Sequence, residues 1–154
     1  MNKETTKKII EDVLNKLSVS FDDVEAIDRG ESFVFMIRTQ DARYLIGSRG
    51  ANLSALNHVV KRVAEQQNDS DERLRFIVDV NNYQENRNEE IKNKAVIIAS
   101  RVKSFKTSAE MDPMSSYERM LVHSALADDC DVETESTGFG RDRRVVIKCK
   151  TENL

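Results

Sequence analysis

The sequence predicts an α+β protein built from two small domains. Two kinds of apolar spacing alternate along its 154 residues: stripes at every third or fourth position, typical of helices, and short alternating runs, typical of strands. A polar and charged stretch at residues 81–90 divides the chain and is typical of a domain boundary. With 39% hydrophobic residues, the chain can bury one modest core or two small ones.

The first half predicts the order helix, strand, strand, helix, helix, strand. In the second strand apolar residues occur at successive positions, so we expect both of its faces to be at least partly covered. The predicted elements are a helix with the stripe Ile10, Val13, Leu14 and Leu17, strands at 24–29 and 32–39 joined at Gly30, a short helix at 42–46, a helix from Ala51 with the stripe Leu53, Leu56, Val60 and Val63, and a strand at 74–80 that begins at Leu74.

A glycine turn, Gly47-Ser48-Arg49-Gly50, lies between the second and third helices. Residues 42–64 contain no acid and four cations, so this window is positive in a chain whose net charge is −3. The glycines allow a tight turn and a close ligand, and the following helix directs free N–H groups and its positive dipole end at the turn. A phosphodiester backbone suits such a site, whereas the simpler interpretation is a corner without a ligand. The four cations are Arg43, Arg49, Lys61 and Arg62.

The second half predicts a long helix, a second helix and an antiparallel sheet. Ser115 and Glu118 form a capping-box signature that predicts the start of the second helix. The predicted elements are a helix with the stripe Ile91, Ala95, Ile98, Val102 and Phe105, a short strand at 106–111 stopped by Asp112-Pro113, a helix from Ser115, a strand at 132–136, a turn at Gly138-Phe139-Gly140, and a strand at 143–150.

Arg119 and His123 are four residues apart and therefore share a face of the predicted helix. We expect both to point outward, where an arginine and a histidine can clamp a phosphate or stack on bases. The alternative is an ordinary exposed pair, since such spacing is common on helices.

The turn after the predicted strand at 132–136 places Phe139 between two glycines and ahead of three arginines, Arg141, Arg143 and Arg144. Its ring either stacks on a base or folds back onto its own hairpin. Five acids lie in residues 128–135, and this acidic run is either an edge that discourages non-specific association or a solvated loop.

These motifs together resemble two known domains. The order over residues 1–82, with Gly47 and Gly50 at the positions of the family glycines, resembles a type II KH domain (αββααβ), although only one of the two variable positions between them is basic. The second motif set is Asp112-Pro113-Met114, Tyr117-Glu118-Arg119 with His123, Val132 to Gly138, and Arg143 to Ile147, and it resembles the R-three-H domain.

A KH domain followed by an R-three-H domain resembles the Jag, or SpoIIIJ-associated, family of bacterial RNA-binding proteins. The resemblance implies a KH domain at 1–84, an R-three-H domain at 85–150 that includes its leading helix, and a tail at 151–154. It further implies a cytoplasmic regulatory protein that binds single-stranded RNA, with Arg119 and His123 as the name-giving pair. Many members carry a further N-terminal domain, and we expect this chain to lack it.

Other function classes find little support in the sequence. Cys130 and Cys149 belong to no metal-binding spacing, His58 and His123 have no nucleophile at a motif distance, and no stretch is apolar enough to span a membrane. We therefore predict no cofactor, no metal, no membrane insertion and no enzymatic activity. Two alternatives stay open: a scaffold that binds a KH-containing partner or a second copy, with incidental RNA binding, and a binder of single-stranded DNA.

Overall fold

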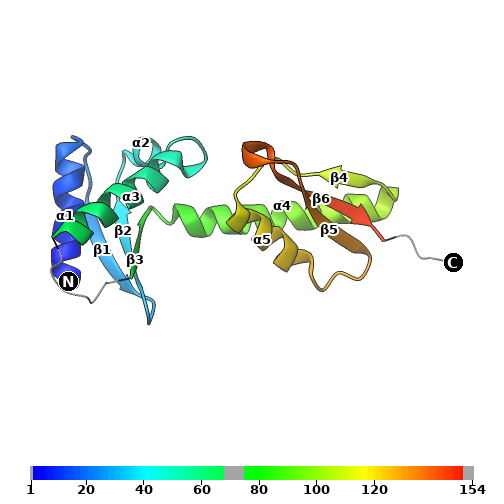
Figure 1. Cartoon of the computed structure of the whole chain (residues 1–154), viewed down its shortest axis with the longest axis horizontal. Helices are drawn as coiled ribbons and strands as arrows, with labels where there is room; N and C mark the ends of the chain where they lie inside the picture. The colour runs from blue at the N-terminus through cyan, green and yellow to red at the C-terminus, as the bar shows by residue number, and fades with distance from the viewer. Residues whose placement is uncertain (1, 68–74, 151–154) are drawn as a thin grey trace. The chain divides into compact units, whose positions relative to one another are not determined.

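The computed structural model describes residues 2–67 and 75–150. The chain divides into two compact units, Met1–Gln84 and Glu85–Leu154. Each unit has its own hydrophobic core. Figure 1 shows both units, coloured from the N-terminus to the C-terminus.

The first unit packs helices on one face of a three-stranded sheet (Figure 1). The order of elements follows the prediction, although Leu74 lies outside the described residues. The elements are α1 (Lys3–Lys16), β1 (Asp23–Asp28), β2 (Phe33–Arg38), α2 (Ala42–Ile46), a 3₁₀ turn (Ser48–Gly50), α3 (Ala51–Gln66) and β3 (Phe76–Val80).

In this sheet, β2 is the central strand, antiparallel to β1 and parallel to β3. Phe35 and Ile37 lie on the face of β2 that is covered by the helices, and both are fully buried against Leu14 and Val60. Met36 on the opposite face is also buried, as the apolar run in this strand predicted. The stripe of α1 differs from the prediction at its end. Leu17 is 57% exposed because α1 stops at Lys16 and the chain turns away through Ser18 at positive φ.

Asn57 ties α3 to the open edge of this sheet. Its side chain donates from Nδ2 to the carbonyl oxygen of Val78 at 2.8 Å and accepts through Oδ1 from the backbone N–H of Val78, also at 2.8 Å. The side-chain amide therefore forms the two hydrogen bonds with Val78 that a neighbouring strand would form. It thereby satisfies the N–H and the carbonyl of this residue on an edge strand. The periodicity of α3 does not indicate this role, because Asn57 lies beside the apolar stripe.

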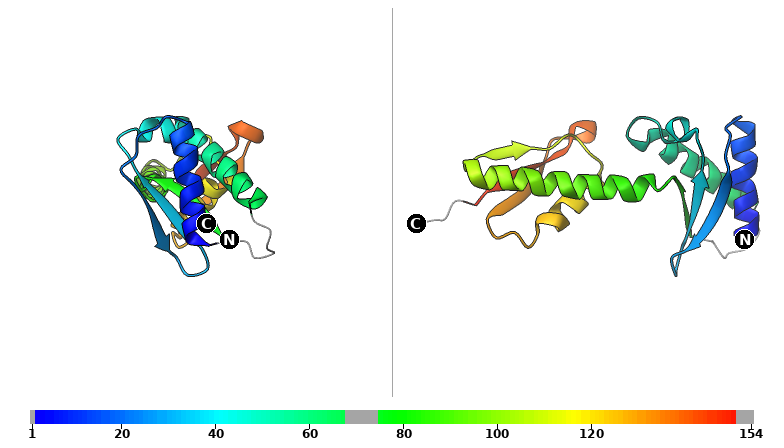
Figure 2. Two further views of the ribbon diagram at one scale, coloured as in Figure 1. Left: turned by 90° about the vertical axis from the view of Figure 1, so that its left-hand side faces the viewer. Right: turned by 180° about the vertical axis from the view of Figure 1, so that it is seen from behind.

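The second unit covers one face of an antiparallel sheet, in the order β4-β6-β5, with two helices (Figures 1 and 2). Val132, Val145 and Ile147 face the helices and are buried against Ala95 and Val122. The elements are α4 (Tyr83–Phe105), β4 (Ser108–Glu110), α5 (Ser116–Leu126), β5 (Val132–Thr137), a 3₁₀ turn (Gly140–Asp142) and β6 (Arg144–Cys149).

The first residues of α4 correct the prediction of a polar boundary followed by a helix from Ile91. Residues 83–90 are helical, because Gln, Glu and Arg favour helices even without an apolar stripe. Asp79 supports this start, since its carboxylate accepts from the backbone N–H of Gln84 at 3.2 Å. At the other end, Phe105 is 73% exposed and not part of the core, because the chain leaves the helix at Lys106 with positive φ.

We predict that Asn57→Ala lowers the free energy of unfolding by about 1–3 kcal/mol, since it removes both hydrogen bonds to Val78 and leaves the N–H and carbonyl of Val78 unpaired. Urea unfolding followed by circular dichroism measures the change, with the exposed Ser54→Ala on the same helix as the control. Equal stability of the two variants would show that the edge of β3 does not depend on Asn57.

Candidate nucleic-acid interface

The Gly47–Gly50 turn forms without side-chain caps. Gly47 ends α2 with φ 70°, and its N–H donates to the carbonyl of Arg43 at 3.0 Å. Gly50 stands at φ 79° directly before α3, and no side-chain hydrogen bond caps the start of that helix. Between them Arg49 also adopts a positive φ of 52°. The turn thus presents backbone and the uncapped first turn of a helix to its surroundings.

A side chain at either glycine would meet a close neighbour. A Cβ at Gly47 would lie 2.5 Å from Cγ of Asn52, and a Cβ at Gly50 would lie 3.0 Å from the ring of Tyr83. Asn52 is held by a hydrogen bond of 2.8 Å from its Nδ2 to the carbonyl of Tyr44. Glycine is therefore favoured at Gly47 by space as well as by its positive φ, and at Gly50 mainly by its positive φ.

Only some of the four cations predicted for residues 42–64 lie near this turn. Arg43, Ser48 and Arg49 are exposed at or beside it. Lys61 lies ten residues into α3, about 15 Å along the helix axis from its start. Arg62 follows it and forms an ion pair with Glu65 at 3.3 Å. The positive window therefore extends along the helix, and it is not concentrated at the glycines.

In the second unit, Arg119 lies on the first turns of α5 and is half-buried. Its Nη1 donates to the carbonyl of Met114 at 2.9 Å and its Nη2 to Oγ of Ser116 at 3.0 Å. The backbone N–H of Met114 in turn donates to the carbonyl of Arg143 at 3.1 Å. The guanidinium is therefore fixed next to the loop that leads into α5, and this loop is held on β6.

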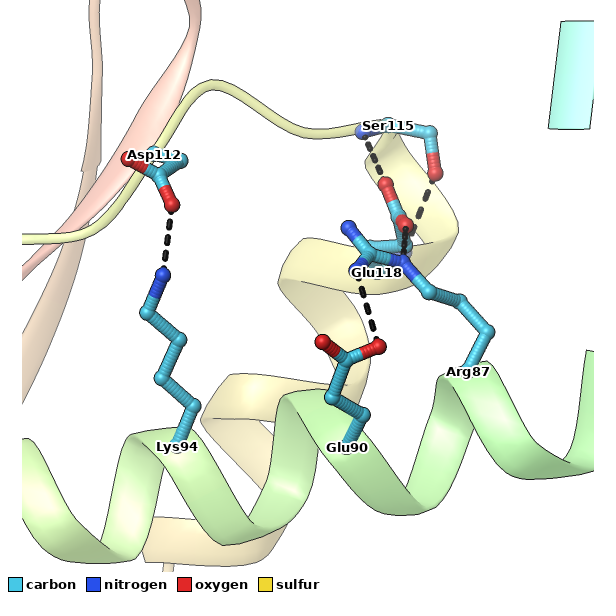
Figure 3. Close-up of polar contacts among 6 residues, drawn as sticks. All are labelled: Arg87, Glu90, Lys94, Asp112, Ser115 and Glu118. Carbon is cyan, nitrogen blue, oxygen red and sulfur yellow. Dashed lines mark hydrogen bonds and ion pairs between the residues drawn. The ribbon is translucent and has the colours of Figure 1, made fainter. Parts of the chain in front are cut away.

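A polar network from α4 supports the same loop (Figure 3). Ser115 and Glu118 form the predicted capping box, with hydrogen bonds of 3.2 and 2.8 Å. Arg87 donates to Glu118 and to Glu90, both at 3.2 Å. Burial alone lowers the pKa of Arg87, but the hydrogen bonds to these two carboxylates outweigh it and raise the pKa above its ordinary value.

Lys94, on the same face of α4, extends this network by one contact. It pairs with Asp112 at 2.5 Å, at the start of the loop that leads to Ser115 (Figure 3). The start of α5 is thus attached to α4 through charged groups at two points, Asp112 ahead of the capping box and Glu118 within it.

His123 corrects the prediction that the Arg119 and His123 side chains both point outward. Its ring lies against β5, with Nδ1 2.6 Å from Oγ1 of Thr134 and Nε2 3.0 Å from Oγ of Ser136. Both ring nitrogens are therefore engaged by the protein, and the imidazole joins α5 to the sheet. Spacing along one helix could not show this, because the partners are on a different element.

The hairpin between β5 and β6 holds Phe139 in solvent. Its side chain is 90% exposed, so the interpretation that it folds back onto the hairpin is wrong. The turn itself is ordered by hydrogen bonds: Asp142 N–H donates to the carbonyl of Phe139 at 3.1 Å, and Nη1 of Arg143 donates to the carbonyl of Gly138 at 3.1 Å. Arg141 is exposed in the same turn.

The acidic and basic runs of this unit largely pair with one another or with neighbouring elements. Arg144 forms an ion pair with Glu110 at 3.3 Å, and Lys148 pairs with Glu135 across β5 and β6. Asp129 pairs with Lys103 at 2.7 Å, and the hydrogen bond from Lys103 lowers the pKa of Asp129. Arg144 is therefore committed to the outer face of the sheet, which leaves Arg141 and Arg143 as the arginines of the hairpin turn.

Within residues 2–67 and 75–150, no group of His, Cys, Asp and Glu side chains could hold a metal ion. No helix in these ranges has the length and apolar character needed to cross a membrane. Cys130 is exposed and Cys149 half-buried, both as free thiols.

Within the second unit, residues 89–148 match the family model of the R-three-H domain. The chain is also similar to proteins named RNA-binding protein KhpB. It is 33% identical to the relative from Clostridium symbiosum, and the match covers 95% of this chain and 65% of the relative. It is 29% identical to the relative from Bacillus subtilis (strain 168), over 83% of this chain and 62% of the relative. A third, from Lactiplantibacillus plantarum, is 31% identical over 88% of this chain and 41% of its own length. The chain thus spans less than two thirds of each relative, and the matches support the resemblance drawn from the sequence.

We predict that His123→Ala lowers the free energy of unfolding by about 1–2 kcal/mol, because the hydroxyls of Thr134 and Ser136 lose their partner. Thermal unfolding of the full chain measures it, with the exposed Ser124→Ala on the same helix as the control. Unchanged stability together with weakened nucleic-acid binding would instead indicate that His123 points outward and contacts the nucleic acid.

Proposed function

We propose that this chain binds single-stranded RNA through two surfaces, one in each unit. The first is the Gly47–Gly50 turn of a KH-like unit. The second is the start of α5 together with the hairpin that carries Phe139. The observation that carries the proposal is the turn: two closely packed glycines at positive φ precede an uncapped helix inside a window without acids.

At the turn, a phosphate would meet backbone N–H groups and the positive end of the α3 dipole. Ser48 adds a hydroxyl, and Arg43 and Arg49 add charge at an exposed position. These contacts recognise a backbone and not a base, so affinity at this surface falls as salt concentration rises. A single strand fits better than a duplex, since its backbone can follow the short turn.

At the second surface, Arg119 is the group that would meet a phosphate. A guanidinium carries five N–H donors, and Arg119 uses Nη1 and Nη2 for one hydrogen bond each within the protein. Its remaining donors are held in a fixed orientation by these bonds, which reduces the entropy lost on binding. His123 acts here as a positioning residue that holds Thr134 and Ser136 beside α5.

The relatives give the proposal its ligand, because three are named as RNA-binding proteins. We place the chain in the cytoplasm with a regulatory role, by analogy with the Jag family resemblance. Single-stranded DNA is distinguished by the same titration with matched deoxy- and ribo-oligonucleotides, since only RNA offers the 2′-hydroxyl.

Replacing Ser48 and Arg49 together by Asp should weaken binding to single-stranded RNA at least about tenfold, because two carboxylates then occupy the position of the phosphate. Fluorescence anisotropy of the full chain measures this, and the melting temperature should barely change since both side chains are exposed. Lys8→Asp with Asn15→Asp makes the same change of charge on the exposed face of α1 and serves as the control. Equal affinity of the two double variants would remove the turn from the site.

A base stacked on Phe139 should contribute about 1–3 kcal/mol, so Phe139→Ala should weaken RNA binding accordingly without lowering the melting temperature. Phe105 is an exposed phenylalanine on α4 of the same unit, and Phe105→Ala is the matched control. If both variants bind as the unchanged protein does, the hairpin is not part of the RNA surface.

A further inference from the structure

A short segment, residues 79–84, joins β3 to α4 and lies within the first unit. Its backbone is unusual, because Asn81 and Asn82 both adopt a positive φ, of 48° and 60°. Few residues other than glycine enter this region, and two in succession persist only where the surrounding structure holds them. Segments held in this way are concentrated at functional sites, and this one directs Tyr83, the residue that follows.

Hydrogen bonds hold this segment on both sides. Asn81 donates from Nδ2 to the carbonyl of Thr39 at 2.8 Å and accepts through Oδ1 from the backbone N–H of Thr39 at 3.2 Å. Asp79 is buried, and its carboxylate accepts from the backbone N–H groups of Val80 at 2.8 Å and Gln84 at 3.2 Å. The segment is therefore fastened both to the end of β2 and to the first turn of α4.

Tyr83 reaches from this segment to the glycine turn. Its side chain is half-buried and packs against the core of the first unit. A Cβ at Gly50 would lie 3.0 Å from Cε1 of the ring and 3.3 Å from the hydroxyl oxygen, so the far edge of the ring lies against Gly50. The contact joins two segments that are distant in sequence, and no periodicity of either segment indicates it.

The hydrogen bond inside the turn is weak. The N–H of Gly50 donates to the carbonyl of Gly47 at 3.4 Å, which is long for such a bond. No side-chain hydrogen bond caps the start of α3, and Arg49 between the glycines adopts a positive φ. Asn52 occupies the space where Gly47 would carry a Cβ, and the ring of Tyr83 borders the corresponding space at Gly50. Each glycine therefore has one side chain packed against it.

This packing matters for a ligand on the turn. A phosphate would be bound there by backbone N–H groups, whose directions depend on how the turn is held. Binding to a loop that is already fixed costs less conformational entropy than binding to one that must first be ordered. A ring against Gly50 removes part of that freedom before the ligand arrives, and it does so without adding charge.

We propose that Tyr83 is a positioning residue for the phosphate site at the Gly47–Gly50 turn, and that it links occupancy of this site to the start of α4. The inference rests on the proposed function and deepens it, since it assigns a residue outside the turn to the same surface. The link is reciprocal: because the ring favours the turn that binds phosphate, a bound phosphate favours the ring in place and steadies residues 81–84.

Anisotropy titrations of the full chain with single-stranded RNA, at several salt concentrations, test the positioning role. Tyr83→Ala should weaken binding at least about fivefold, because ordering of the turn then opposes binding. The dependence of affinity on salt should stay the same, because no phosphate contact is lost. Tyr83→Phe should bind within about twofold of the unchanged protein, since the ring remains.

Phe33 provides the matched control. It begins β2, at the opposite end of that strand from Thr39, and it is also half-buried against the core of the first unit. Phe33→Ala should lower the melting temperature as Tyr83→Ala does and leave RNA affinity unchanged. Tyr83→Leu serves where Tyr83→Ala does not fold, because leucine keeps an apolar side chain in the core but is too short to reach Gly50. It should also weaken RNA binding.

Hydrogen exchange measures the link itself. In the unchanged protein, saturating RNA should slow exchange of the backbone N–H groups both at residues 48–52 and at residues 81–84. In Tyr83→Ala, saturating RNA should slow exchange at residues 48–52 and leave residues 81–84 as they are without RNA. A residue that only stabilised the fold would alter exchange equally with and without RNA.

The outcomes separate this inference from the proposed function. If Tyr83→Ala binds as tightly as Phe33→Ala, or if RNA slows exchange only at residues 48–52 of the unchanged protein, the inference is overturned and the turn stands. An equal loss with Tyr83→Phe and Tyr83→Ala would place the hydroxyl on the RNA and overturn the positioning role. If Ser48→Asp with Arg49→Asp binds normally and RNA slows no exchange at residues 48–52, the proposed function fails at this surface and the inference fails with it.

Discussion

Burial of one face of α3 is the constraint on which the first unit depends. Leu53, Leu56 and Val60 fix this helix on the sheet, and two other features then follow from its position. Its uncapped first turn is presented behind the glycines, and Asn57 reaches the edge of β3. The binding proposed at the turn thus depends on a packed helix. The side chains of Ser48 and Arg49 are exposed, so we expect that their charges can be changed without loss of the fold.

In the second unit, polar contacts fix the start of the helix that carries the candidate residue. Its core is made by α4, α5 and the inner face of the sheet, but the start of α5 is positioned by Arg87, Glu118 and the capping box of Ser115. Side chains of Arg87 and Glu118 are 28% and 17% exposed, so their ion pair is screened less than one at the open surface. Arg119 therefore stands on a helix terminus that is rigid for reasons unrelated to a ligand, which is the condition for a preorganised phosphate contact.

Local patterns predicted the elements because periodicity and turn chemistry are properties of neighbouring residues. The short helix at 42–46, the helix from Ala51 and the capping box at Ser115 were predicted and are confirmed. The early start of α4 was missed because its first turns are polar. The environments of His123 and Arg144 were missed because their partners, on β5 and β4, are distant in sequence.

Ultraviolet crosslinking of the full chain to RNA inside cells, followed by identification of the crosslinked peptides, tests the central claim most directly. The account predicts that RNA is recovered with the protein and that crosslinks fall in two places: residues 43–52 around the turn and residues 137–144 around Phe139. The variant with Asp at positions 48 and 49 should lose the first set and keep the second. Recovery of a protein partner without RNA, or crosslinks confined to other surfaces, would contradict it and favour a scaffold.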